Sequence, residues 1–199
     1  MPLLSTRANA SARGYGMFGG AAEVPNSYES IATYTVGSGG SSTITFSSIP
    51  STYKHLQIRA IARTSATGGT TQNLNMTINN DTSTAYSFHQ LLGDGSSASA
   101  YGENVNRSNC VQILHITTSS AGANIFGAGI IDILDYTNTN KNRTVRSLRG
   151  QEQNNTDGGI ALQSYLYTGT TAISRLDFFA GSGNLVQYSS FALYGIKGA

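Results

Sequence analysis

Alternating apolar and polar residues recur along the chain from about residue 28. The clearest case is segment 53–63, where Leu56, Ile58 and Ala60 share one side of an extended strand. Further predicted strands cover segments 74–78, 86–92, 110–117, 144–150, 160–167, 172–179 and 188–196. Short strands separated by Gly, Asn and Ser, without a helical period, predict an all-β domain.

Two other segments carry more specific expectations. Residues 29–36 and 43–46 flank the turn cluster 37–40, which predicts a β-hairpin. Residues 125–136 form the most apolar stretch, which is typical of a central strand buried on much of both faces. The Ser- and Ala-rich stretch near residues 95–109 is expected to be a loop.

These segments amount to about ten strands, which favours an antiparallel β-sandwich. A jelly-roll-like arrangement suits this number of strands, although the strand order does not follow from the sequence. We therefore expect a single β-sandwich domain over residues 28–199. Residues 1–27 lack a regular period and are expected to form an extended N-terminal arm.

Composition narrows the class of protein. Only 11% of the 199 residues are charged, against about 25% in an average globular protein, and long surface helices normally need such residues. A formal net charge of +2 gives no reason to expect a nucleic-acid partner. The single cysteine excludes a disulfide framework. We expect neither a membrane-inserted helix nor a cleaved signal peptide, because no apolar run of suitable length occurs.

The arm carries side chains suited to anchoring. Glycines alternate there with large apolar groups, so the backbone could follow a groove on a partner. The candidate anchoring residues are Arg7, Arg13, Tyr15, Met17 and Phe18. Residues 14–19 also match the dinucleotide pattern G-x-G-x-x-G, but no strand precedes them, so we expect no nucleotide site.

No pattern of catalytic or metal-ligating residues stands out. His55, His89 and His115 lie on different predicted strands, without a second ligand at close spacing. No serine occupies a G-x-S-x-G elbow, and no pair of carboxylates is selected by spacing. The sequence therefore predicts a protein that is not an enzyme and holds neither a metal nor a cofactor.

Two sets of residues are candidates for contacts with a partner. Lys141, Arg143 and Arg149 are expected on one face of a strand, with Arg146 on the other. The first three, together with Tyr101, are candidates for contact with an acidic partner subunit or an anionic glycan. The alternatives are a solvated strand for the basic residues and ordinary sheet packing for the tyrosines.

Several segments resemble structural proteins of tailed bacteriophages. They are residues 5–19 around Gly-Tyr-Gly-Met-Phe-Gly, residues 28–50 and 53–59, and the C-terminal Ser-Ser-Phe-Ala-Leu-Tyr-Gly-Ile of residues 189–196. The resemblance implies a virion component assembled in the host cytoplasm and bound to other virion proteins. It also implies a homotrimer of β-sandwich or jelly-roll domains, without catalytic residues.

Within that class, a tail fibre or adhesin subunit contacting a host-surface glycan is the favoured expectation. Its polar loops, such as 94–109 and 151–159, would then face the cell. A capsid decoration, or cement, protein that stabilises the head is the first alternative. A free carbohydrate-binding module is a more distant one.

Overall fold

The computed structural model describes residues 27–154 and 157–198, with the side chains of 103–106 left out. The described residues form an all-β fold without helices. The strands are β1 (Tyr28–Thr35), β2 (Ile44–Phe46), β3 (His55–Ala62), β4 (Thr71–Ile78), β5 (Tyr86–Gly93), β6 (Ala98–Arg107), β7 (Cys110–Thr117), β8 (Gly127–Ile133), β9 (Arg143–Glu152), β10 (Gly158–Tyr167), β11 (Leu176–Ala180) and β12 (Ser190–Ile196).

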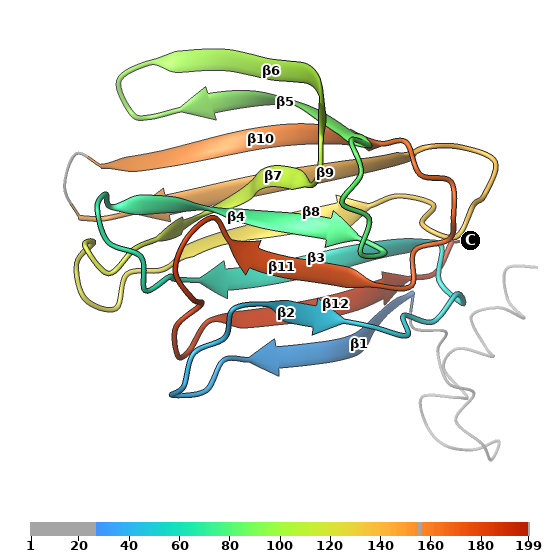
Figure 1. Cartoon of the computed structure of the whole chain (residues 1–199), viewed down its shortest axis with the longest axis horizontal. Coiled ribbons are helices and arrows are strands. Elements are labelled where there is room, and N and C mark those ends of the chain that lie inside the picture. Colours follow the sequence, from blue (N-terminus) through green and yellow to red (C-terminus); the bar gives the residue numbers. More distant parts are fainter. Residues whose placement is uncertain (1–26, 155–156, 199) are drawn as a thin grey trace, which may run out of the picture.

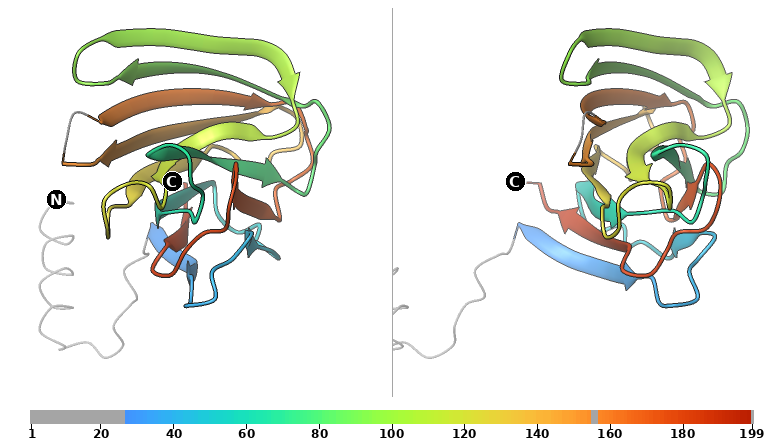
Figure 2. Two further views of the ribbon diagram at one scale, coloured as in Figure 1. Left: turned by 60° about the vertical axis from the view of Figure 1, so that its left-hand side comes forward. Right: turned by 90° about the vertical axis from the view of Figure 1, so that its left-hand side faces the viewer.

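These strands form two antiparallel sheets packed face to face (Figure 1). The larger sheet has eight strands in the order β1-β12-β3-β8-β9-β10-β5-β6, and the smaller has four in the order β2-β11-β4-β7. Strands β6 and β1 lie at opposite edges of the larger sheet, as both views of Figure 2 show. The expected antiparallel β-sandwich is confirmed.

The strand pairing has a nested order. Strand β1 pairs with β12, β2 with β11, β3 with β8, and β4 with β7, so early strands meet late strands throughout. One long hairpin folded over on itself gives this order, and we infer from it a jelly-roll connectivity. Strands β5 and β6, and strands β9 and β10, are then two inserted pairs that widen only the larger sheet.

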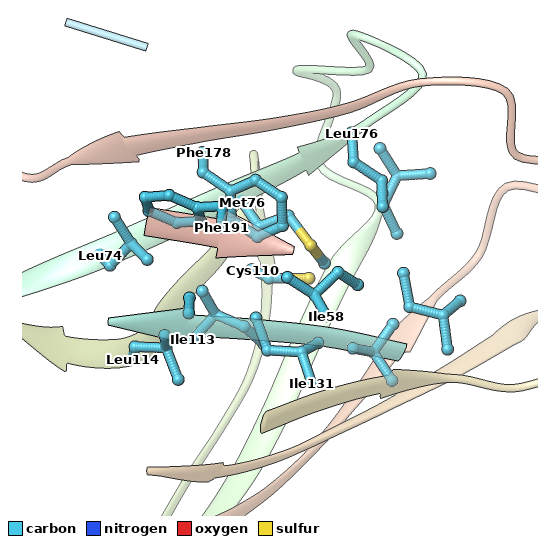
Figure 3. Close-up of a cluster of buried hydrophobic side chains, with 14 of the residues drawn as sticks. Ile58, Leu74, Met76, Cys110, Ile113, Leu114, Ile131, Leu176, Phe178 and Phe191 are labelled. Atoms are coloured by element: carbon cyan, nitrogen blue, oxygen red, sulfur yellow. The ribbon is translucent and has the colours of Figure 1, made fainter. Parts of the chain in front are cut away.

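The core lies between the two sheets and follows from the period-two pattern. Leu56, Ile58 and Ala60 of β3 are buried, while alternate residues of the strand are more exposed. They meet apolar side chains of the smaller sheet, including Met76 and Phe178 (Figure 3). Burying such side chains is the main favourable contribution to the fold.

The structure corrects three expectations about strands. Segments 29–36 and 43–46 do not form a hairpin, because β1 joins the larger sheet and β2 the smaller. The expected loop at 95–109 contains strand β6. The apolar stretch 125–136 contains β8, whose inner residues Ile131 and Ile133 are buried while Ala128 on the outer side is exposed.

Candidate interaction surface

The outer face of the larger sheet, which points away from the smaller sheet, carries two rows of aliphatic residues. Strand register fixes both rows, since paired residues on neighbouring strands lie side by side. The first row runs through Gly93, Ile160, Gly150, Ala128 and Ile61, on strands β5, β10, β9, β8 and β3. The second row runs through Leu91, Leu162, Leu148, Ile130 and Arg59 on the same strands.

The large side chains in these rows are exposed to an unusual degree. Exposed fractions reach 59% for Ile160, 57% for Leu91 and 56% for Leu162, and are 47% for Leu148 and 45% for Ile61. Scattered exposed aliphatic residues are normal, but a contiguous apolar patch marks an interaction site. We call the two rows together the apolar face.

Small residues create a hollow in the apolar face. Gly150 and Ala128 lie between the larger side chains of Ile160 and Ile61 in the first row. These residues line a shallow, mostly apolar hollow, which Arg59 and Ala192 border. The surface therefore offers raised side chains and a depression into which a partner's side chain can fit.

A third row borders the apolar face and is polar. It runs through His89, Ser164, Arg146, Asp132 and Gln57. The Gln57 amide Nε2 donates a hydrogen bond of 2.8 Å to Asp132 Oδ1. This row gives the apolar face a polar rim, which is the usual anatomy of a protein interface.

Aromatic rings extend this rim towards β1. The Tyr28 hydroxyl donates to Gln57 Oε1 at 2.6 Å, and its ring stacks on Tyr194 with centroids 4.8 Å apart. The Arg59 guanidinium lies over the Tyr28 ring at 6.0 Å. Burial raises the pKa of Tyr28, although the charge of Arg59 opposes the rise, so its hydroxyl is protonated at neutral pH.

The basic residues predicted as partner contacts do not gather on one surface. Lys141 is exposed in a turn, where its ammonium pairs with Asp135, which also pairs with Lys54 at 2.8 Å. Arg143 and Arg149 project from the inner face of β9 and are 0% and 2% exposed. In this fold these two arginines are therefore too buried to contact a glycan or an acidic subunit at the surface.

Arg143 instead holds two connecting segments together from inside. Its guanidinium donates to the backbone carbonyls of Tyr136 at 3.3 Å, Thr170 at 3.0 Å and Thr171 at 3.3 Å, and also to that of Lys141. These carbonyls belong to the connections before β9 and after β10. The role of Arg143 that the contacts indicate is structural.

Arg149 is the least satisfied of the buried polar residues around it. Its Nη2 donates to Gln90 Oε1 at 2.9 Å, whereas Nε and Nη1 have no hydrogen-bond partner. Burial lowers its pKa to about 10.

Tyr101 is half exposed, with 46% of its surface accessible. It pairs with Gln90 across β5 and β6, and its ring centroid lies 5.8 Å from that of Phe88.

The structure brings Tyr101 and Arg149 to a common neighbour, Gln90, but leaves Lys141 and Arg143 apart from them. Arg149 lies six positions beyond Arg143 along β9, which is about 20 Å of extended strand. The candidate anchoring residues Arg7, Arg13, Tyr15, Met17 and Phe18 lie outside the described residues. Of the described candidates, Tyr101, Lys141, Arg143 and Arg149 are not members of the two rows of the apolar face.

The apolar face was not predicted from the sequence, because its strands reverse the usual arrangement of aliphatic residues inside and polar residues outside. In β10 the aliphatic residues Ile160 and Leu162 point outward, while the polar Gln163 points inward and is 1% exposed. The alternation is visible in the sequence, but the strand was predicted over 160–167 without saying which of its sides is interior. The signal that could have revealed the face was a group of polar residues at inward positions of β9 and β10, such as Ser147 and Gln163, which share a buried hydrogen bond.

Other candidate chemistry can be stated briefly for the described part of the chain. His55, His89 and His115 lie on β3, β5 and β7. Within residues 27–154 and 157–198, no group of three or more His, Cys, Asp or Glu residues is placed to hold a metal ion. The same residues include no helix long and apolar enough to span a bilayer.

Comparison with known proteins adds no relative. The chain matches no protein-family model, and no curated protein matches it. The class that the fold and surface define is thus a two-layer antiparallel β-sandwich with an exposed apolar sheet face.

Proposed function

We propose that this chain is a non-enzymatic structural subunit of a bacteriophage virion. The apolar face is the observation that carries the proposal, because it is a broad surface suited to assembly with another protein. The segments that resemble phage structural proteins lie at both ends of the chain and in the early strands. Low charge and a rigid two-sheet body also suit a particle component.

Within the virion, we place the chain in a tail fibre or adhesin. In that role residues 1–27 dock the subunit onto other tail proteins, and the sandwich reaches towards a host-surface glycan. The subunit is made in the host cytoplasm, where the particle is assembled.

Labelling of intact particles tests this function. Antibodies against the recombinant chain would be applied to purified particles from an infected culture, and bound antibody would be located by electron microscopy. We expect label at the tail in a small number of copies. Label spread over the head would replace the tail assignment with capsid decoration, and unlabelled particles beside free protein in the lysate would refute a virion role.

A second experiment tests the arm. A chain without residues 1–20 should keep the sandwich, because strand β1 begins only at Tyr28. We expect its circular dichroism and solubility to match the full chain and its incorporation into particles to be lost. Normal incorporation of the shortened chain would show that these residues do not anchor it.

A further inference from the structure

The apolar face and its polar third row are together large enough to form a stable interface. Five strands about 4.8 Å apart and three outward rows about 6.8 Å apart give a footprint of roughly 24 Å by 20 Å. Raised side chains present more accessible surface than this flat area. Covering the face would therefore bury surface within reach of the roughly 600–1,000 Å² per partner of specific interfaces.

The order of residues in the first row suits a second copy of the same row. Across β5 to β3 the row reads Gly93, Ile160, Gly150, Ala128 and Ile61. When a second row is laid over it in the reverse order about Gly150, each large residue meets a small one. Ile160 then lies over Ala128, and Ile61 over Gly93.

In the second row the same operation places large side chains over large side chains, so the match there is of apolar character and not of size. Leu148 meets Leu148, Leu162 meets Ile130, and Leu91 meets the aliphatic stem of Arg59, according to the register of strands β5, β10, β9, β8 and β3. Arginine stems commonly cover apolar surface while the charged head stays in water. Aliphatic residues therefore meet aliphatic carbon along the whole row.

In the third row, polar groups meet polar groups. His89 lies over Gln57 and Ser164 over Asp132 when the row is reversed about Arg146. The two Arg146 side chains approach each other at the rim, where Asp132 lies on the neighbouring strand of each sheet. Charge is thereby kept at the border of the footprint and away from its aliphatic centre.

We propose that the apolar face binds the same face of a second copy of this chain, across a two-fold axis running along β9. Such an axis makes the interface isologous, so one surface supplies both halves. It also sets the two β9 strands parallel, which lies within the range of about 30° that aligned stacked sheets keep. The pair differs from the homotrimer implied by the phage resemblance and does not depend on the virion role.

The mass of the full chain in solution tests the pair. Light scattering during gel filtration should give twice the 20.9 kDa mass of one chain. Gly150→Asp places two carboxylates opposite each other at the axis, and a Cβ there meets only the Gly159 carbonyl oxygen at an ordinary 3.6 Å. Ile160→Ser weakens the interface in a second way, because it removes the most exposed aliphatic side chain of the apolar face.

The control carries the same change at a distance from the face. Gly37→Asp lies in a turn where a Cβ meets nothing within 4 Å. We expect Gly150→Asp and Ile160→Ser to weaken the pair at least 100-fold, with circular dichroism unchanged, and Gly37→Asp to leave it intact. Wild-type protein that is monomeric or trimeric at about 0.1 mM, or folded face variants that remain paired, would overturn the proposal.

Cross-linking checks the axis itself. Stacked sheets lie about 10 Å apart, which suits a short bis-maleimide between two copies of Gly150→Cys. Native Cys110 is 0% exposed and should not react. A cross-linked dimer from Gly150→Cys, absent from Gly37→Cys, supports the two-fold axis on β9, whereas equal cross-linking of both variants contradicts it.

Discussion

His115 is a residue whose protonation should weaken the fold as the pH falls. It lies on β7, largely enclosed between the sheets, and burial lowers its pKa to about 3, with the charge of Arg149 as a second cause. Its ordinary value is 6.5. Between these two values the unfolded chain binds the proton and the folded chain does not, so stability is retained above pH 6.5 and declines towards pH 3.

Replacing this imidazole should remove part of the pH dependence. From pH 7 to pH 5 the wild-type free energy of unfolding is expected to fall by about 1–2 kcal/mol more than that of His115→Gln. Urea unfolding at both pH values measures the difference, with His89→Gln, an exposed histidine on β5, as the matched control. Identical losses in wild type and His115→Gln would mean that His115 does not govern this range.

The arginines of β9 show how far the sequence alone predicts the position of a single side chain. Period two correctly places Arg143 and Arg149 on one side of the strand and Arg146 on the other. Period two alone does not say which side is interior. The usual expectation of leucine inside and arginine outside is reversed in this strand. Leu148 lies outside at 47% exposure and Arg149 inside at 2%. Only the carbonyls and the glutamine that meet the arginines in three dimensions explain that choice.

At the scale of elements, glycines let β7 lie close against β8. A Cβ added to Gly127 would lie 2.1 Å from the His115 carbonyl oxygen and 2.9 Å from the Ile116 Cα, both backbone atoms of β7. Backbone atoms cannot move aside as a flexible side chain can. Alanine at this position must therefore push the two strands apart.

We expect Gly127→Ala to lower the free energy of unfolding by about 1–3 kcal/mol. Gly37→Ala is the control, because Gly37 lies away from the apolar face and its added Cβ meets nothing within 4 Å. That control should stay within about 0.5 kcal/mol of wild type. Urea unfolding of the three proteins compares them, and equal stability of Gly127→Ala and wild type would exclude this close packing.

The sequence predicted which segments form strands better than it predicted which strands pair with one another. Strands β3 and β12 carry strong alternation, and these strands and the apolar β7 were predicted close to their observed bounds. Strand β6 was missed because its Ser, Ala and Gly residues resemble a loop and it pairs on one side only, with β5. The assignment of β1 and β2 to different sheets depends on partners more than 100 residues away, β12 and β11. Such non-local contacts leave no mark on a local pattern.

The asymmetry of the whole molecule explains why an apolar face exists. The two pairs β5–β6 and β9–β10 extend the larger sheet and leave the smaller one at four strands (Figure 1). Three of the five strands of the apolar face, β5, β9 and β10, come from these pairs. The surface proposed for assembly is thus built largely from the inserted segments, whereas the nested strands supply most of the core.

This origin of the face also predicts how the paired molecule responds to salt. Its centre is aliphatic, and its charged groups, Arg59, Arg146 and Asp132, lie at the border. Raising NaCl from about 0.05 M to about 0.5 M shortens the Debye length from roughly 14 Å to roughly 4 Å and screens exposed charges, but it leaves apolar burial intact. The dissociation constant, measured by sedimentation equilibrium, should therefore change less than about threefold. A pair held by its charged rim would instead weaken by more than about tenfold. That result would mean that the arginines, and not the leucines, supply most of the affinity.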